Sequence, residues 1–434
     1  MLYINKQSII FLHIEYNIYF NSVSQGGSLM ANCIIAQSGG PTSVINSSVV
    51  GLLHANRELG AFDNVYGGLN GIEGILNGNI INLSEKSDEE INTFRFTPSS
   101  GLGSCRYKLK DVDSSLEEYE KLMEILKSYD IKVFFYVGGN DSMDTTAKLS
   151  KYAELNNIDI KFIGIPKTID NDLMYTDHTP GFGSAAKFIG TTAIETYLDA
   201  SVYINNGIFI LETMGRDTGW LAASACIARV NDKPVADFIY LPETAFDKAN
   251  FLNDVRKRFE ENNKVYIVVS EGIRDENGRF ISELECSAQD KFGHAQLGGV
   301  SNYLKMLIIE SGITKRVKAL ELGVLQRCAM HCASYTDLTE AYEAGKAALQ
   351  YATNGETGKM VTIERISNSP YTVQYGLVEA DKVANNVSYF PKEWINKEGN
   401  FVTEEAYSYF EPLIKDLPNL VFEGNLPKYT VFNQ

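Results

Sequence analysis

The chain has 434 residues, of which 44% are hydrophobic and 22% are charged, so it can form large cores and does not resemble an intrinsically disordered protein. Its formal net charge of −16 argues against partners that are bound through overall positive charge. We therefore expect neither nucleic acid nor a membrane surface as a partner.

The first 29 residues lack the regular pattern of the rest of the chain. A secretion signal is disfavoured, because His13 and Glu15 interrupt the apolar patch at residues 9–12 and no small-residue cleavage site follows cleanly. The string QGGSLM, which ends at Met30, can be encoded by a purine-rich tract just before a start codon, as in a bacterial ribosome-binding site. We therefore predict that Met30 is the biological start and that residues 1–29 are a non-native or disordered extension. The alternative is a native arm with little order.

From Met30 onward, apolar segments of strand length alternate with segments of helical periodicity. The first predicted helix covers residues 44–59 and is closed by Gly60. Strands are predicted at residues 33–36, 131–137, 161–166, 207–211 and 265–270. Strand, glycine-bearing turn and helix in succession are typical of α/β folds with mainly parallel sheets, in which ligands bind beyond the carboxyl ends of the strands.

Three turns contain residue types that suit phosphate. In the turn SGGPTS, Gly40 lets backbone N–H groups approach an anion at the start of a helix. In the loop GLGSCR, Arg106 can bind phosphate through two parallel hydrogen bonds. In the turn GGNDS, Asn140 and Asp141 place oxygen atoms at a strand end, and Ser142 is expected to cap the next helix. Each of these features alone is also explained by an ordinary turn, loop or cap.

The segment PKTIDND carries the densest set of chemical groups. It places Lys167, the Thr168 hydroxyl and two carboxylates, Asp170 and Asp172, directly after a strand. One carboxylate can accept a proton from an attacking hydroxyl while the other holds Mg²⁺, and the lysine can neutralise phosphate. The spacing alone leaves open which carboxylate does which.

Further along the chain, polar groups follow three more apolar segments. Met214, Gly215 and Arg216 form one turn, and Glu271 and Arg327 follow later segments. A glutamate at a strand end can accept hydrogen bonds from sugar hydroxyls, and arginines can bind a sugar phosphate.

Together these segments resemble the phosphofructokinase family, and in particular its pyrophosphate-dependent members. The matching strings SGGPTSVIN, GLGSCR, VGGNDS, PKTIDND, ETMGRDTGW, VSEG and LGVLQR occur in family order from residue 38 to residue 327. The resemblance implies that Asp170 is the base that deprotonates the sugar 1-hydroxyl, with Lys167 and Arg106 as the other catalytic residues. It also implies that Asp172, with Asn140, lies at a Mg²⁺ site.

The same resemblance implies two sets of binding residues. The phosphoryl donor is expected at Gly40, Arg106, Asn140, Asp141, Ser142 and Lys167. The sugar phosphate is expected at Thr168, Asp170, Met214, Gly215, Arg216, Glu271, Lys318 and Arg327.

By the same resemblance, Asp141 and Lys167 favour pyrophosphate over ATP as the donor. Asn140 and Asp141 stand where ATP-dependent relatives have Asp-Gly, and Lys167 stands where they have glycine. A glycine at position 141 would let a nucleotide α-phosphate lie against the backbone, whereas Asp141 fills that space and repels it. Lys167 adds a cation for the two-phosphate donor, which suits a reaction that depends on positioning and charge stabilisation.

Three positions depart from the family pattern at the sugar phosphate. Gly207 and Lys318 stand where relatives often have arginines that reach a neighbouring subunit, and Val324 stands where they often have His or Tyr. These departures concern the identity of the sugar phosphate more than the type of reaction. Asn140 is likewise neutral where an acid would help to hold Mg²⁺.

The resemblance implies a fold of two Rossmann-like α/β domains with the active site in the cleft between them. Residues 30–180 with about 327–380 are expected to bind the donor, residues 181–326 to bind the sugar phosphate, and residues 381–434 to form a C-terminal extension packed on the body. The implied reaction is Mg²⁺-dependent transfer of a phosphoryl group from pyrophosphate to the 1-hydroxyl of fructose 6-phosphate in glycolysis. A cytoplasmic homodimer or homotetramer is expected.

Alternatives within this class are an ATP-dependent enzyme and the same chemistry on another sugar phosphate, such as sedoheptulose 7-phosphate. An alternative of another class is a non-catalytic regulatory subunit, against which the retained Asp170, Asp172, Lys167 and Arg106 argue. A nucleotide-binding dehydrogenase is disfavoured, because no strand is followed by GxGxxG with an acid about 20 residues further on.

Overall fold

The computed structural model describes residues 31–204, 206–282 and 299–432. By its internal contacts the chain divides into residues 1–30 and residues 31–434. The extension predicted at residues 1–29 lies outside the described residues, so it stays a prediction.

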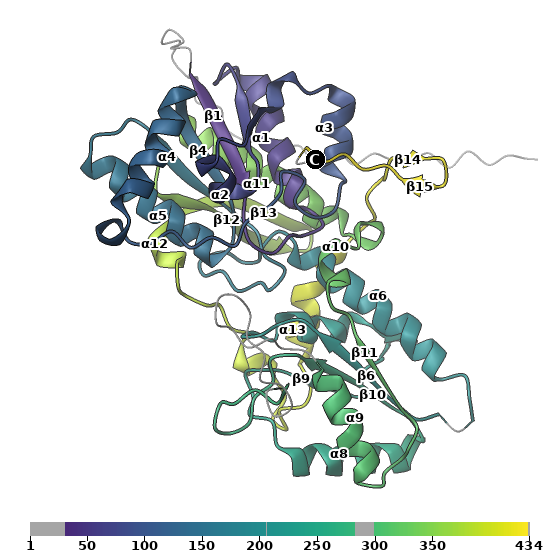
Figure 1. The fold of residues 1–434 in the computed structure, drawn as a ribbon. Helices are drawn as coiled ribbons and strands as arrows, with labels where there is room; N and C mark the ends of the chain where they lie inside the picture. Colours follow the sequence, from purple (N-terminus) through teal and green to yellow (C-terminus); the bar gives the residue numbers. More distant parts are fainter. Residues whose placement is uncertain (1–30, 205, 283–298, 433–434) are drawn as a thin grey trace, which may run out of the picture. The chain divides into compact units, whose positions relative to one another are not determined.

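Seven strands form the larger of two main sheets, in the order β13-β12-β5-β4-β1-β2-β3 (Figure 1). The five central strands run parallel, and the antiparallel strands β13 and β3 lie at the two edges. The strands are β1 (Asn32–Gln37), β2 (Val65–Gly68), β3 (Ile80–Asn82), β4 (Ile131–Gly138), β5 (Lys161–Pro166), β12 (Lys359–Asn368) and β13 (Tyr371–Glu379).

Both faces of the larger sheet are covered by helices, which explains why its central strands are apolar throughout. Successive residues of β1 point to opposite faces: Ile35 packs in a core with α1, α3 and α11, while Ile34 packs in another with α2, α4 and α5. The helices are α1 (Ile45–Leu59), α2 (Gly71–Leu76), α3 (Asp88–Arg95), α4 (Leu116–Ser128), α5 (Asn140–Leu155) and α11 (Tyr335–Thr353).

Helices α1 and α11 cross at a distance that only glycine permits. A Cβ atom at Gly51 would lie 1.9 Å from the Tyr342 carbonyl oxygen, and one at Gly345 would lie 2.0 Å from the Ser48 carbonyl oxygen. This close packing holds α1, and with it the turn that precedes it, against the rest of the fold.

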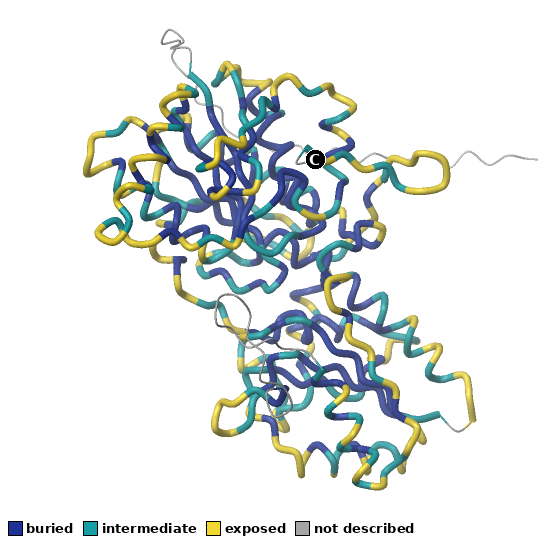
Figure 2. Tube along the Cα trace, in the orientation of Figure 1, coloured by how far each residue is buried: buried dark blue, intermediate teal, exposed yellow. Residues whose placement is uncertain are grey.

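The second main sheet contains four parallel strands in the order β11-β6-β10-β9. Its strands are β6 (Ile208–Thr213), β9 (Phe238–Tyr240), β10 (Val265–Ser270) and β11 (Val317–Glu321). The helices around it are α6 (Phe182–Ala200), α7 (Trp220–Ala223), α8 (Lys248–Asn262) and α9 (Val300–Glu310). Figure 2 shows that the strands of both main sheets are mostly buried, whereas many of the outer turns are exposed.

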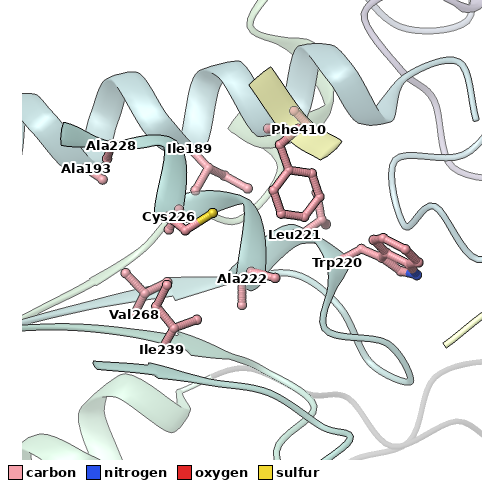
Figure 3. Packing of buried hydrophobic residues seen from close by; sticks show 14 of the residues in the cluster. Ile189, Ala193, Trp220, Leu221, Ala222, Cys226, Ala228, Ile239, Val268 and Phe410 are labelled. Carbon is pink, nitrogen blue, oxygen red and sulfur yellow. The ribbon is translucent and has the colours of Figure 1, made fainter. Parts of the chain in front are cut away.

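After α12 (Ala380–Val383), which packs against α5, residues 390–414 pack against the second sheet. Phe410 packs beside Leu221 and Trp220 in the core that also contains Ile189 of α6 and Val268 of β10 (Figure 3). The remaining elements are β7 (Arg229–Val230), β8 (Lys233–Pro234), α10 (Leu325–Cys328), α13 (Glu404–Phe410), β14 (Phe422–Glu423), β15 (Leu426–Pro427) and several short 3-10 helices.

The predicted fold class is confirmed, since the fold is mixed α/β with mostly parallel sheets. The domain boundaries drawn from the sequence stay predictions. None of the helices in the described part of the chain is both long and apolar enough to cross a membrane.

Candidate active site

The turns singled out in the sequence line one cavity of about 550 Å³. They meet there because they follow the carboxyl ends of β1, β4 and β5 in one sheet and of β6 and β10 in the other. The lining includes thirteen of the predicted site residues: Gly40, Arg106, Asn140, Asp141, Ser142, Lys167, Thr168, Asp170, Asp172, Met214, Arg216, Glu271 and Arg327.

Two predicted residues do not line this cavity. Gly215 lies just behind it and donates its N–H to Glu271 Oε1 at 3.3 Å. Lys318 lies on the edge strand β11, where its ammonium is 3.0 Å from the Asp199 carboxylate.

Sequence reasoning missed several residues that line the cavity, including Asp217 and Lys108. Asp217 directly follows Arg216 in the string ETMGRDTGW, so its position beside a predicted phosphate-binding residue was a usable signal. Lys108 lies 3.9 Å from Asp141 and carried no such signal, because it stands outside the glycine-rich loop.

Lys167 lies at the centre of the cationic side of the cavity. It is buried, and its ammonium donates to the Gly40 carbonyl oxygen at 2.7 Å. Burial lowers the pKa of Lys167 to about 8, an effect that the carboxylates of Asp170 and Asp172 oppose. A bound anion would restore the charged form, so this lysine is suited to holding phosphate.

Gly39 and Gly40 have no side chains of their own, which leaves room at this turn for the side chains of Lys167 and Arg327 and for a ligand. A Cβ atom at Gly39 would lie 3.3 Å from Lys167 Nζ, and one at Gly40 would lie 3.1 Å from a terminal nitrogen of Arg327. Gly39 also has a φ of +75°, a region that favours glycine. The Arg327 Nε is buried without a hydrogen-bond partner among the described residues, as expected of a group that awaits an anion.

The helix that supplies Asn140 and Asp141 begins earlier than expected. Ser142 was predicted to cap it, which is wrong: α5 begins at Asn140, Gly139 occupies the N-cap position, and no side chain caps the helix. Ser142 is buried in the first turn, packed against Gly138. The uncapped N-terminus of α5 therefore directs its backbone N–H groups at the cavity, which favours an anion there.

Asp170 and Asp172 form the acidic side of the cavity. The Asp170 backbone N–H donates to the Thr168 hydroxyl at 3.1 Å, and the Thr218 hydroxyl donates to the Asp170 carbonyl oxygen at 3.2 Å. Burial raises the pKa of Asp170, and burial together with the neighbouring Asp170 charge raises the pKa of Asp172 to about 7. A carboxylate with a raised pKa is a better proton acceptor at neutral pH.

The second sheet supplies Met214 and Glu271. The Met214 N–H donates to Gln326 Oε1 at 3.2 Å, which ties the end of β6 to the segment before Arg327. Burial and the Asp170 charge raise the pKa of Glu271 to about 7. Glu271 thus offers a carboxyl group that can bind hydroxyl groups in either protonation state.

The loop that carries the two aspartates is anchored by a buried charged network. His178, near the end of this loop, contacts Asp177 through Nδ1 at 2.8 Å and Glu340 of α11 through Nε2 at 2.7 Å. Arg365 of β12 lies 2.9 Å from the same Asp177 carboxylate, and the Tyr371 hydroxyl donates to Glu340 at 2.6 Å. The network therefore ties the loop to a helix and two strands.

This network predicts a loss of stability at alkaline pH. Burial alone would lower the pKa of His178. The carboxylates of Glu340 and Asp177 outweigh this effect and raise the pKa to about 9, against 6.5 for an unperturbed histidine. The imidazolium therefore stabilises the fold fully below pH 6.5, and this contribution, on the order of 3 kcal/mol, is lost as the pH rises through 9. Urea unfolding at several pH values measures it. Glu340→Gln should reduce the dependence of the unfolding free energy on pH between 6.5 and 9. An unchanged dependence would contradict the role given to His178.

The cavity also has a polar group suited to a divalent cation. Asn140 Oδ1 is buried without a hydrogen-bond partner among the described residues. Asp172 and Asp170 place carboxylates in the same lining, and burial raises the pKa of both, which a cation bound beside them would lower. Oxygen ligands of this kind suit Mg²⁺. In the described residues, no group of three or more His, Cys, Asp or Glu side chains is arranged to hold a metal ion.

This chain is similar in sequence to known proteins over most of its length. The phosphofructokinase family matches residues 32–352. A pyrophosphate–fructose 6-phosphate 1-phosphotransferase from Halomonas elongata is 40% identical over 400 residues, which is 92% of this chain and 95% of that protein. A sulfofructose kinase from Alkalicoccus urumqiensis is 32% identical and covers 88% of this chain and 95% of that protein.

The fold is matched by solved structures as well. The crystal structure of a pyrophosphate-dependent phosphofructokinase from Marinobacter aquaeolei has a TM-score of 0.83 and 35% sequence identity, covering 93% of this chain and 97% of that one. The resemblance inferred from the motifs is therefore confirmed over most of the chain, and the protein belongs to the phosphofructokinase family.

Proposed function

We propose that this protein transfers a phosphoryl group from pyrophosphate to the 1-hydroxyl of fructose 6-phosphate. The observation that carries the proposal is the pairing of Lys167 with Asp141 in one cavity, next to the two aspartates of the PKTIDND loop. The similarity to enzymes named for pyrophosphate and fructose 6-phosphate supports the same reaction.

The cationic side of the cavity suits a compact, highly charged donor. Lys167, Arg106 and Arg327 line it together with the uncapped N-terminus of α5. Pyrophosphate has no nucleoside to bind, so charge and backbone N–H groups supply its recognition. Asp141 lies in the first turn of α5, where it opposes a third phosphate by charge and occupies the space of an α-phosphate.

The acidic side of the cavity suits the acceptor. Asp170 takes the proton from the sugar 1-hydroxyl, and the Thr168 hydroxyl, 3.4 Å from the Asp170 carboxylate, restricts its orientation. Met214, Arg216 and Glu271 lie on the other side, where they bind the sugar and its phosphate. The protein thereby holds donor and acceptor in line, which is the main contribution of a protein to phosphoryl transfer.

A divalent cation completes the site. Asp172 and Asn140 would hold Mg²⁺, which neutralises charge on the phosphate oxygens when it is bound. The side-chain oxygen atoms of Asp172 and Asn140 also repel a second anion from the acidic side of the cavity.

Two other sugars compete with fructose 6-phosphate as the acceptor in this proposal. The sulfofructose kinase among the relatives shows that this part of the family includes an enzyme named for a sugar with a different anionic group. Gly207 and Val324, which depart from the family pattern, bear on the same choice. Fructose 6-phosphate should be turned over with a kcat/KM at least tenfold higher than sulfofructose or sedoheptulose 7-phosphate.

The proposed enzyme is a cytoplasmic homo-oligomer. Phosphorylated sugars are charged and do not cross membranes unaided, so an enzyme that uses them works where they are made. Lys318 lies outside the cavity on the exposed edge strand β11, and an oligomer that pairs this edge would let Lys318 of the partner subunit reach a sugar phosphate. Sedimentation of the purified protein would show a dimer or tetramer, and a monomer would contradict this arrangement.

The donor assignment is tested by comparing pyrophosphate with ATP. The wild-type protein, with fructose 6-phosphate and Mg²⁺, should use pyrophosphate at least 100-fold better in kcat/KM. Asp141→Gly should gain ATP use, because it removes both the charge and the bulk that oppose an α-phosphate. Glu154→Gly, an exposed position near the other end of α5, is the matched control and should leave the donor preference unchanged. A wild-type enzyme that runs on ATP and ignores pyrophosphate would refute the assignment.

A further inference from the structure

The residue between the two active-site aspartates points away from the cavity. Asn171 is 3% exposed and does not line the cavity, whereas Asp170 and Asp172 on either side of it do. Its φ of +55° lies in the left-handed region, which asparagine tolerates better than most residues. This conformation turns the backbone so that both carboxylates face the same space.

Both ends of the Asn171 side chain are held. Its Oδ1 accepts the Thr179 N–H at 3.0 Å, and its Nδ2 donates to the Tyr409 hydroxyl at 3.1 Å. The first bond closes the loop on itself, whereas the second reaches a residue 238 positions further along the chain.

Tyr409 connects two points of the same loop. Its hydroxyl accepts from Asn171 and donates to the Asp177 carbonyl oxygen at 2.7 Å. One hydroxyl group therefore joins two points of the loop, Asn171 and Asp177, and fixes the position of the segment between them.

The Tyr409 ring is itself immobilised. It packs against Trp220 and Trp394 with ring centroids 5.4 and 5.3 Å apart, and the Arg365 guanidinium lies 4.4 Å from its centre. A terminal nitrogen of Arg365 also donates to the Tyr409 carbonyl oxygen at 3.0 Å. Tyr409 directly precedes Phe410, which packs in the core beside Trp220 and Leu221 (Figure 3). The hydroxyl is therefore presented by a rigid support.

A second contact joins the C-terminal part of the chain to the same loop. The Ser388 N–H donates to the Asp172 carbonyl oxygen at 2.8 Å, and the Ser388 carbonyl oxygen accepts the Trp220 indole N–H at 2.9 Å. The loop is thus held from behind at Asn171 and at Asp172 by residues that follow position 380.

We propose that Tyr409 and Asn171 are positioning residues, which set the geometry of Asp170 and Asp172 for phosphoryl transfer. The C-terminal segment then contributes to turnover without touching either substrate. This inference rests on the roles proposed above for Asp170 and Asp172. It predicts an effect on kcat, because a carboxylate displaced by a fraction of an ångström still permits binding but aligns the reacting hydroxyl poorly.

The first test is Tyr409→Phe, which removes the hydroxyl and keeps the ring. We expect kcat to fall at least tenfold, with both KM values within threefold of wild type. Tyr351→Phe is the matched control, because the Tyr351 hydroxyl also donates to a backbone carbonyl oxygen at 2.7 Å, that of Tyr375, away from the cavity. The control should lose a similar amount of thermal stability and keep wild-type kcat.

The second test combines Tyr409→Phe with Asn171→Gly. Glycine accepts the positive φ without strain, so Asn171→Gly removes only the side-chain bonds. Because the two residues share one hydrogen bond and support the same loop, the loss of kcat in the double variant should be well below the product of the two single losses.

The outcomes separate this inference from the proposed reaction. A Tyr409→Phe enzyme with kcat within twofold of wild type would overturn the positioning role. The positioning role would also be overturned if Tyr409→Phe lost no more kcat than Tyr351→Phe, or if the two losses of kcat multiplied in the double variant. In each of these cases the wild type would still turn over and Asp170→Ser would still lower kcat strongly, so the reaction itself would stand.

Discussion

Replacing Asp170 by serine should lower kcat by about 10²–10⁴-fold, the usual range for loss of a general base. Asp170 lines the cavity at the carboxyl end of β5, and its burial raises its pKa so that it accepts a proton readily. Serine keeps a small polar side chain at this position but cannot take the proton. Steady-state kinetics with pyrophosphate and fructose 6-phosphate should show the loss in kcat with little change in KM.

The control for this variant lies near the other end of the same strand. Asp159→Ser removes an exposed carboxylate that pairs with Lys132 at 3.3 Å, and it should leave kcat unchanged. Asp170→Ser should not lower the melting temperature, because it removes a buried carboxylate with a raised pKa. An Asp170→Ser enzyme within tenfold of wild type would remove this residue from the role of base.

Replacing Lys167 by methionine should lower kcat/KM for pyrophosphate by about 10²–10³-fold, as is typical when one group that stabilises transition-state charge is removed. Methionine keeps the length of the side chain but loses the cation that lies beside Gly40. The protein should remain folded, because the ammonium is buried and its lowered pKa shows that burial disfavours the charge.

Lys161→Met provides the comparison for this loss. Lys161 lies at the start of β5 and, like Lys167, donates to a backbone carbonyl oxygen, that of Ala352 at 3.3 Å, but it does not line the cavity. Donor kinetics should separate the two variants, with Lys161→Met close to wild type. Equal and small effects in both would show that Lys167 does not hold the donor.

Much of the site was predictable because parallel sheets gather the ends of their strands. The apolar segments before Gly40, Asn140 and Lys167 became β1, β4 and β5, neighbours in one sheet, so the turns that follow them had to meet at one edge. The string PKTIDND likewise indicated Asp170 and Asp172 as the acidic pair of the site, since both follow directly on an apolar strand. Local hydrophobic pattern and turn chemistry were sufficient for these features.

What the sequence by itself determined was therefore the α/β class, five of the eleven strands of the two main sheets and the chemistry of the turns that follow them. The tertiary structure decided that Ser142 is not a cap, that Lys108 lines the cavity, and that Tyr409 supports Asn171. Each of these depends on where a segment packs rather than on its own composition. The bond between Asn171 and Tyr409 joins positions 238 residues apart, and only the burial of the C-terminal segment against the second sheet brings them together.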